Sequence, residues 1–91
     1  MKRVRVVVTG RVQGVGYRYS LYIVADRAGL SGWVRNRYDG SVEAELEGTA
    51  QAVAEVLAWM LDGPPGACVE DRHVAAREPT GAKGFRVLGD A

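Results

Sequence analysis

The sequence has 91 residues, of which 47% are hydrophobic and 25% charged, and its formal net charge is +1. This length suits one domain with one core, predicted to span residues 1–91, and the composition is that of a soluble globular protein rather than a disordered one. The single cysteine excludes a disulfide framework, the lack of any apolar run near ~20 residues excludes a membrane-spanning helix, and the low total charge argues against a dedicated binder of duplex nucleic acid.

The N-terminal segment alternates in polarity, with Val4, Val6 and Val8 on one face. This period of two predicts a strand over residues 3–9, and so short and alternating a run is not that of a signal peptide. We therefore expect a cytoplasmic protein that is a monomer and has no membrane or nucleic-acid partner.

The next segment is rich in glycine and then becomes helical in its periodicity. Glycines within residues 10–16 predict a loop. Residues 19–28 predict a helix, which Gly29 ends. The apolar positions of this helix are Leu21, Val24, Ala25 and Ala28.

Two strands joined by a tight turn are predicted after this helix. Residues 32–37 (GWVRNR) form the first of them, and residues 38–41 carry a turn signal. Residues 42–48 alternate strictly, so that Val42, Ala44 and Leu46 face one way and Glu43, Glu45 and Glu47 the other. This alternation predicts a hairpin whose glutamates form the solvated face.

A second helix is predicted from Thr49 to Leu61, with Thr49 as its N-cap and the Gly-Pro-Pro-Gly run at residues 63–66 as its stop. Its buried stripe is predicted to consist of Val53, Val56, Leu57, Met60 and Leu61. Strands over residues 67–77 and 84–88 follow. The order βαββαβ with an extra short C-terminal strand predicts an α+β, ferredoxin-like two-layer sandwich, in which two helices cover one face of a mainly antiparallel sheet.

The glycine-rich loop lies where a strand meets a helix and is followed by Arg18. At such a position several backbone N–H groups lack helical partners, and glycines let them converge into a concave anion site. A guanidinium fork can bind the same anion through paired charge-assisted hydrogen bonds. Residues 1–40 also hold eight basic side chains against two acidic ones. The pattern therefore predicts a site for phosphate or a similar anion.

Taken alone, this loop is not specific. It lacks the Gly-Lys-Ser/Thr of a P-loop, and it lacks the context of a dinucleotide-binding fingerprint. A tight structural turn with a solvent-facing arginine would explain the same residues.

Two longer motifs identify a family. GRVQGVGYR at residues 10–18, read together with GWVRN…DG at residues 32–40, resembles the acylphosphatases, small ferredoxin-like enzymes that hydrolyse the carboxyl-phosphate bond of acyl phosphates. The resemblance covers nearly the whole chain, in length and in the order of elements.

The resemblance implies roles for particular residues. Arg18 would bind the substrate phosphate, and Asn36 would position the attacking water. Backbone N–H groups of the loop would hold the phosphate together with Arg18, and the residues of that loop are Val12, Gln13, Gly14, Val15, Gly16 and Tyr17.

Three positions depart from the pattern of many family members. Gly16 stands where many members have a bulkier residue, Leu21 where some have threonine, and Arg37 where threonine or serine is common. These departures bear on rate or loop rigidity rather than on the class of reaction.

The chemistry of the substrate explains how so few groups would suffice. An acyl phosphate is a mixed anhydride whose carboxylate leaving group has a parent acid with a pKa of roughly 4 to 5, so it departs without a general acid. Phosphoryl transfer mainly requires positioning and charge stabilisation. The lone His73 and Cys68 are interpreted as structural, and we expect no metal site and no cofactor.

Two other functions are compatible with part of the sequence. A non-catalytic acylphosphatase-like module could bind a phosphate group or a partner, although the presence of both Arg18 and Asn36 favours an enzyme. An RNA-recognition module has the same order of elements, but it needs an aromatic-rich third strand. Here that strand is acidic and has no aromatic residue, so this reading is rejected.

Overall fold

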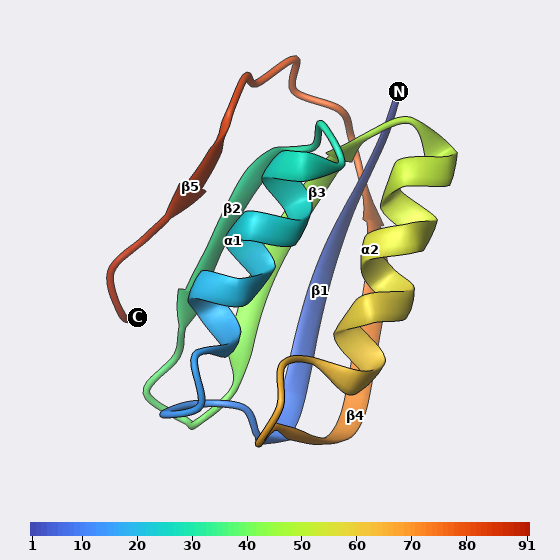
Figure 1. The fold of residues 1–91 in the computed structure, drawn as a ribbon. Helices are drawn as coiled ribbons and strands as arrows, with labels where there is room; N and C mark the ends of the chain where they lie inside the picture. Colours follow the sequence, from blue (N-terminus) through green and yellow to red (C-terminus); the bar gives the residue numbers. More distant parts are fainter.

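Five strands and two helices form two layers in the computed structural model, which describes residues 1–91 (Figure 1). The strands are β1 (Lys2–Arg11), β2 (Ser31–Asn36), β3 (Val42–Gly48), β4 (Cys68–Arg77) and β5 (Phe85–Val87). The helices are α1 (Tyr17–Arg27) and α2 (Ala50–Asp62). Both helices lie on the same face of the sheet, as the sequence predicted.

The strands are arranged in the order β4-β1-β3-β2-β5. All neighbours pair antiparallel except β2 and β5, which are parallel. The ferredoxin-like α+β fold with a short extra C-terminal strand is therefore confirmed. Because β1 and β2 are separated only by β3, the segments that follow β1 and β2 meet at one end of the sheet.

The core lies between the sheet and the helices and follows the predicted alternation. The fully buried residues of this interface include Val4, Val6, Val8, Leu21, Ala25, Val34, Ala44, Leu46, Val53, Val56 and Met60. Leu61 departs from the predicted stripe, since 51% of it is exposed. It lies one position past Met60, and this rotation of about 100° carries its side chain off the sheet-facing side of α2.

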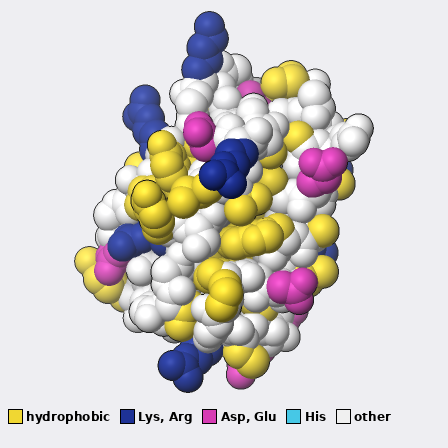
Figure 2. All heavy atoms as spheres, in the orientation of Figure 1, with side chains coloured by type: hydrophobic (Ala, Val, Ile, Leu, Met, Phe, Trp, Pro, Cys, Tyr) yellow, Lys and Arg dark blue, Asp and Glu magenta, His cyan; other side chains and the backbone are white.

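The helix-bearing face carries its apolar side chains mostly over and between the two helices, while Lys and Arg side chains occur singly around them (Figure 2). Neither helix is long and apolar enough to cross a lipid bilayer.

Gly10 belongs to β1 rather than to the predicted loop. The β1–β4 register shifts between Thr9 and Gly10, and Gly10 has φ 112°, which other residues rarely adopt. A Cβ at this position would lie 2.3 Å from the carbonyl oxygen of Cys68. The glycine therefore permits a bulge and a close approach of β4, and the loop begins only after Arg11.

The helix α1 begins two residues earlier than predicted. Gly16 takes the N-cap position with φ 77° and ψ 17°, and no side chain caps the helix. Since glycine adopts this left-handed conformation at little cost, the chain turns directly into Tyr17. As a result, Arg18 lies in the first turn of α1.

The glutamate row of β3 is not the solvated face that the alternation predicted. Glu43 is only 4% exposed and Glu47 only 2%. Glu43 accepts hydrogen bonds from Arg5 at 2.6 Å and from Arg35 at 2.7 Å. Arg3 binds Glu45 at 2.6 Å and Glu47 at 3.0 Å. The face without helices is therefore closed by arginine–glutamate pairs instead of water.

Candidate active site

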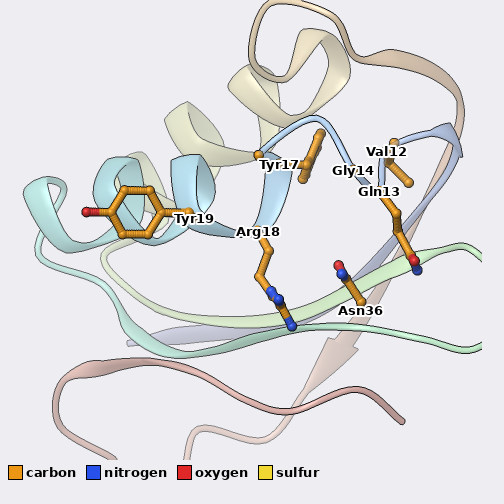
Figure 3. Close-up of a pocket in the computed structure, with 8 residues that line it drawn as sticks. Val12, Gln13, Gly14, Tyr17, Arg18, Tyr19 and Asn36 are labelled. Carbon is orange, nitrogen blue, oxygen red and sulfur yellow. The ribbon is translucent and has the colours of Figure 1, made fainter.

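A pocket of about 310 Å³ opens where the loop after β1 enters α1, beside the end of β2 (Figure 3). Its lining residues are Val12, Gln13, Gly14, Gly16, Tyr17, Arg18, Tyr19 and Asn36. Both residues expected to be catalytic, Arg18 and Asn36, therefore line one cavity together with most of the expected phosphate-binding loop. Val15 is the exception, because it does not line the pocket and instead packs partly buried against the core.

The backbone of this loop carries a run of N–H groups without protein acceptors. The first hydrogen bond of α1 is donated by Ser20 to the carbonyl of Gly16, at 3.0 Å. The N–H groups of residues 13–19 donate no hydrogen bond to another protein atom. Gly14 and Gly16 have φ values of 74° and 77°, and these conformations turn successive N–H groups toward a common side.

Val12 begins the loop but differs from the residues after it. Its N–H donates to the carbonyl of Gly10 at 3.1 Å, and its side chain is 1% exposed in the core. Val12 therefore anchors the start of the loop and lines the pocket, while its N–H group is already bonded.

Arg18 extends from the first turn of α1 along the pocket, and 34% of its side chain is exposed. Its Nη1 donates to Oδ1 of Asp90 at 3.0 Å and to the carbonyl of Leu88 at 3.4 Å. Asp90 was not foreseen as a neighbour. The short C-terminal strand was predicted, but its parallel pairing with β2, which brings the tail to this end of the sheet, has no signal in the sequence.

Asn36 is the last residue of β2, and its side chain points toward the loop (Figure 3). Its Oδ1 is buried and has no hydrogen-bond donor. A buried acceptor without a donor is costly, so it is uncommon in folded proteins. Its backbone carbonyl, by contrast, accepts a hydrogen bond from the N–H of Ala91 at 3.0 Å.

Gln13 directs its side chain away from the loop's N–H groups. Its Nε2 donates to the carbonyls of Arg37 at 2.7 Å and Ser41 at 2.8 Å, which lie in the turn between β2 and β3. Sequence reasoning placed Gln13 in the loop through its backbone but gave no signal for this side-chain contact.

The two tyrosines beside Arg18 have different surroundings. Tyr17 is buried, packs against Trp59 with ring centroids 5.5 Å apart, and donates its hydroxyl to the carbonyl of Met60 at 2.6 Å. Burial raises the pKa of the Tyr17 hydroxyl well above its ordinary value. Tyr19 is mostly exposed. Tyr17 therefore fixes the end of the loop on α2.

No three His, Cys, Asp or Glu side chains lie together as a possible metal-binding group. Besides the backbone and two tyrosines, the polar residues that line the pocket are Arg18, Gln13 and Asn36.

Comparisons with known proteins point to one family. A family model described as acylphosphatase matches residues 4–87, which include every residue that lines the pocket. An acylphosphatase of Trichormus variabilis is 54% identical over 85 residues, covering 93% of this chain and 84% of that protein. An acylphosphatase of Thermococcus kodakarensis is 47% identical over 91 residues, covering 98% of this chain and 100% of that protein. The crystal structure of acylphosphatase from Bacillus subtilis has a TM-score of 0.93 at 39% identity, covering 97% of this chain and 99% of that one.

Proposed function

The chain belongs to the acylphosphatase family, and we propose that it carries out the hydrolysis of acyl phosphates in the pocket between the 12–18 loop and Asn36. One observation carries this assignment to the pocket. Unpartnered backbone N–H groups and a guanidinium from residues 13–19 line a single cavity together with the amide of Asn36, which comes from a segment 17 residues further along the chain.

The phosphate is bound by the loop and Arg18. The free N–H groups of residues 13–19 and the partial positive charge at the start of α1 favour an anion. Arg18 adds a formal charge and can bind two phosphate oxygens at once. Because the backbone holds the loop N–H groups in place before the substrate arrives, they stabilise charge on the equatorial oxygens without reorganisation in the transition state.

Asn36 positions the attacking water. Once the Asn36 amide turns Oδ1 toward the pocket, a water there can donate a hydrogen bond to it and supply the donor that the protein itself does not provide. The water's lone pair is then directed at phosphorus, opposite the leaving oxygen.

The bond changes are simple. The water oxygen forms a bond to phosphorus, and the bond between phosphorus and the carboxyl oxygen breaks with its electron pair leaving on the carboxylate. The carboxylate of an acid with a pKa of roughly 4 to 5 needs no proton to depart. The proton of the water passes to a phosphate oxygen, so the products are a carboxylate and inorganic phosphate.

We further propose a single domain over residues 1–91 that acts as a monomer in the cytoplasm, with a small-molecule acyl phosphate as its partner and without a metal ion or other cofactor. One buried cluster unites both helices and four of the strands, which supports the single domain.

The assigned roles can be separated by measuring hydrolysis of benzoyl phosphate with a chelator present. Asn36→Ala should lower kcat by about 10² to 10³-fold, in the range of losing one oriented polar group, while inorganic phosphate still binds. Arg18→Ala should lose both turnover and phosphate binding. Arg11→Ala is the matched control, because Arg11 is exposed, lies seven residues away and does not line the pocket.

Three results would contradict this proposal. Full turnover by Asn36→Ala would remove Asn36 from the reaction, and loss of activity in the chelator would call for a metal. If the natural protein binds phosphate through Arg18 but hydrolyses no acyl phosphate, it is instead a phosphate- or partner-binding module.

A further inference from the structure

The Gln13 side chain joins the loop to the turn that follows Asn36. An amide NH₂ has two hydrogens to donate. Gln13 uses both, since its Nε2 lies 2.7 Å from the carbonyl oxygen of Arg37 and 2.8 Å from that of Ser41. These carbonyls belong to the first and last residues of the turn between β2 and β3. The two hydrogen bonds of the Gln13 amide are the only ones between the 12–16 loop and this turn.

The turn itself is closed by local hydrogen bonds. The N–H of Arg37 donates to the carbonyl of Ser41 at 2.9 Å, and that of Gly40 donates to the carbonyl of Arg37 at 3.1 Å. Asp39 accepts from both the N–H and the hydroxyl of Ser41. Asn36 directly precedes the turn, and Ala91 contacts both, since its carbonyl accepts from the N–H of Tyr38 at 2.7 Å and its N–H donates to the carbonyl of Asn36 at 3.0 Å. What fixes the turn relative to the loop is the Gln13 amide.

The loop, in contrast, is anchored independently of Gln13. Val12 at its start is buried in the core, and Tyr17 at its end is hydrogen-bonded to the carbonyl of Met60. Loss of the Gln13 amide therefore removes the hydrogen bonds between the loop and the turn next to Asn36, while the N–H groups that face the pocket keep their anchors.

We propose that Gln13 is a positioning residue that sets where the Asn36 amide lies relative to the phosphate-binding loop. This inference rests on the function proposed above, in which the loop holds phosphate and Asn36 holds the water. Displacement of about 1 Å between reacting groups can cost up to 10²-fold in rate. The effect of Gln13 therefore falls on kcat and requires Asn36 to be present.

A double-mutant cycle tests this. We expect Gln13→Ala to lower kcat for benzoyl phosphate roughly tenfold, within the range expected for a misplaced group, while the inhibition constant of inorganic phosphate changes less than about twofold. In the Asn36→Ala background the same substitution should produce no further loss of kcat. Gln13→Met provides a second variant that keeps side-chain volume and lacks both donors. Gln51→Ala is the control, because the Gln51 amide bonds only to Glu55 on the exposed side of α2.

The outcomes are distinct. Equal loss of kcat in the natural and Asn36→Ala backgrounds, a parallel loss of phosphate binding, or unchanged kcat in both Gln13 variants would each overturn the inference. If Asn36→Ala loses turnover while the Gln13 variants do not, only the role of Gln13 fails. If Asn36→Ala keeps full turnover, the proposed function of Asn36 fails first.

Discussion

The Arg18 guanidinium, which we propose binds phosphate, is hydrogen-bonded to a carboxylate of the protein itself. Its Nη1 lies 3.0 Å from Oδ1 of Asp90, and both side chains reach solvent, at 34% and 50% exposure. An exposed pair of this kind contributes about 0.2 to 1 kcal/mol. Asp90 therefore competes weakly with an incoming phosphate for the same donors and also adds a negative charge next to the anion site.

Asp90→Asn should tighten phosphate binding. Removing the charge removes both the competing acceptor and the repulsion, so the inhibition constant of inorganic phosphate is expected to fall by about fivefold at most. The effect should shrink as salt concentration rises, because exposed charges are screened. Asp62→Asn is the control, since Asp62 is exposed at the end of α2 and makes no ion pair. Weaker phosphate binding by Asp90→Asn would instead mean that Asp90 orients Arg18.

The places of single residues could be predicted from sequence where they follow from the order of elements. Arg18 was expected at a helix start and Asn36 near a strand end, and both line the same pocket. The contacts of Gln13 and Asp90 are made through space to segments distant in sequence. No local pattern encodes such contacts, and only the folded chain reveals them.

Elements differ in how sharply the sequence marks their ends, and β1 is the clearest case. Its alternating valines predicted the strand, but Gly10 was grouped with the loop because glycine signals turns as readily as bulges. The register shift beside Gly10 and the short distance from its would-be Cβ to the Cys68 carbonyl show that this glycine serves strand pairing. The distinction depends on β4, which lies nearly 60 residues further along the chain.

Gly10→Ala should destabilise the fold much more than Gly14→Ala. Both positions have positive φ, which costs a non-glycine residue about 1 to 2 kcal/mol. Only at Gly10 does the new methyl also meet backbone, 2.3 Å from the Cys68 oxygen, whereas nothing lies within 4 Å at Gly14. With overpacking added, we expect a total loss of about 2 to 5 kcal/mol for Gly10→Ala. Urea unfolding of both variants measures the difference in unfolding free energy. Equal losses would show that β4 shifts to accommodate the methyl group at little cost.

At the scale of the whole molecule, the charge asymmetry of the sequence is explained by sheet order. In the sequence, the basic first half and the acidic β3 strand are separate features. The first favours binding of an anion, and the second predicts a row of glutamates that faces solvent. In the fold, β3 lies between β1 and β2, so Arg3 is opposite Glu47 and Arg35 is opposite Glu43. Part of the basic excess is thus neutralised inside the molecule. Alternation alone predicts which residues share a face, but it does not predict which strand lies next to them.

This pairing changes the acid–base behaviour of two glutamates. Burial raises the pKa of the Glu43 carboxyl, but hydrogen bonds and charge from Arg35 and Arg5 outweigh it and hold that pKa below its ordinary value of 4.5. The N–H of Thr80 lowers the pKa of Glu47, with further help from Arg3 and Gly81 against the opposing effect of burial. In both cases the folded state prefers the ionised form.

Stability should therefore fall in acid. Because the folded pKa of each glutamate lies below its unfolded value, the unfolded chain binds protons first as pH decreases. The stabilisation is complete above the ordinary pKa near 4.5 and is lost progressively as pH falls through the lower, folded value. Urea unfolding measured from pH 7 to pH 3 should show a steep decline in the unfolding free energy below about pH 5.

Glu43→Gln separates the contribution of the arginine cluster from that of other carboxylates. At pH 7 the variant should lose about 1 to 3 kcal/mol, the range for charge-assisted hydrogen bonds, since Arg5 and Arg35 no longer meet an ionised partner. As pH falls, the unfolding free energy of the variant should decrease less steeply than that of the natural protein. The reason is that the variant lacks one carboxyl group that prefers the ionised form in the folded state. Glu55→Gln, on the exposed side of α2 and in contact only with Gln51, should keep the natural slope. If Glu43→Gln also keeps that slope, the arginines on the face of the sheet without helices do not stabilise the ionised form of Glu43. The acid sensitivity then arises elsewhere in the fold.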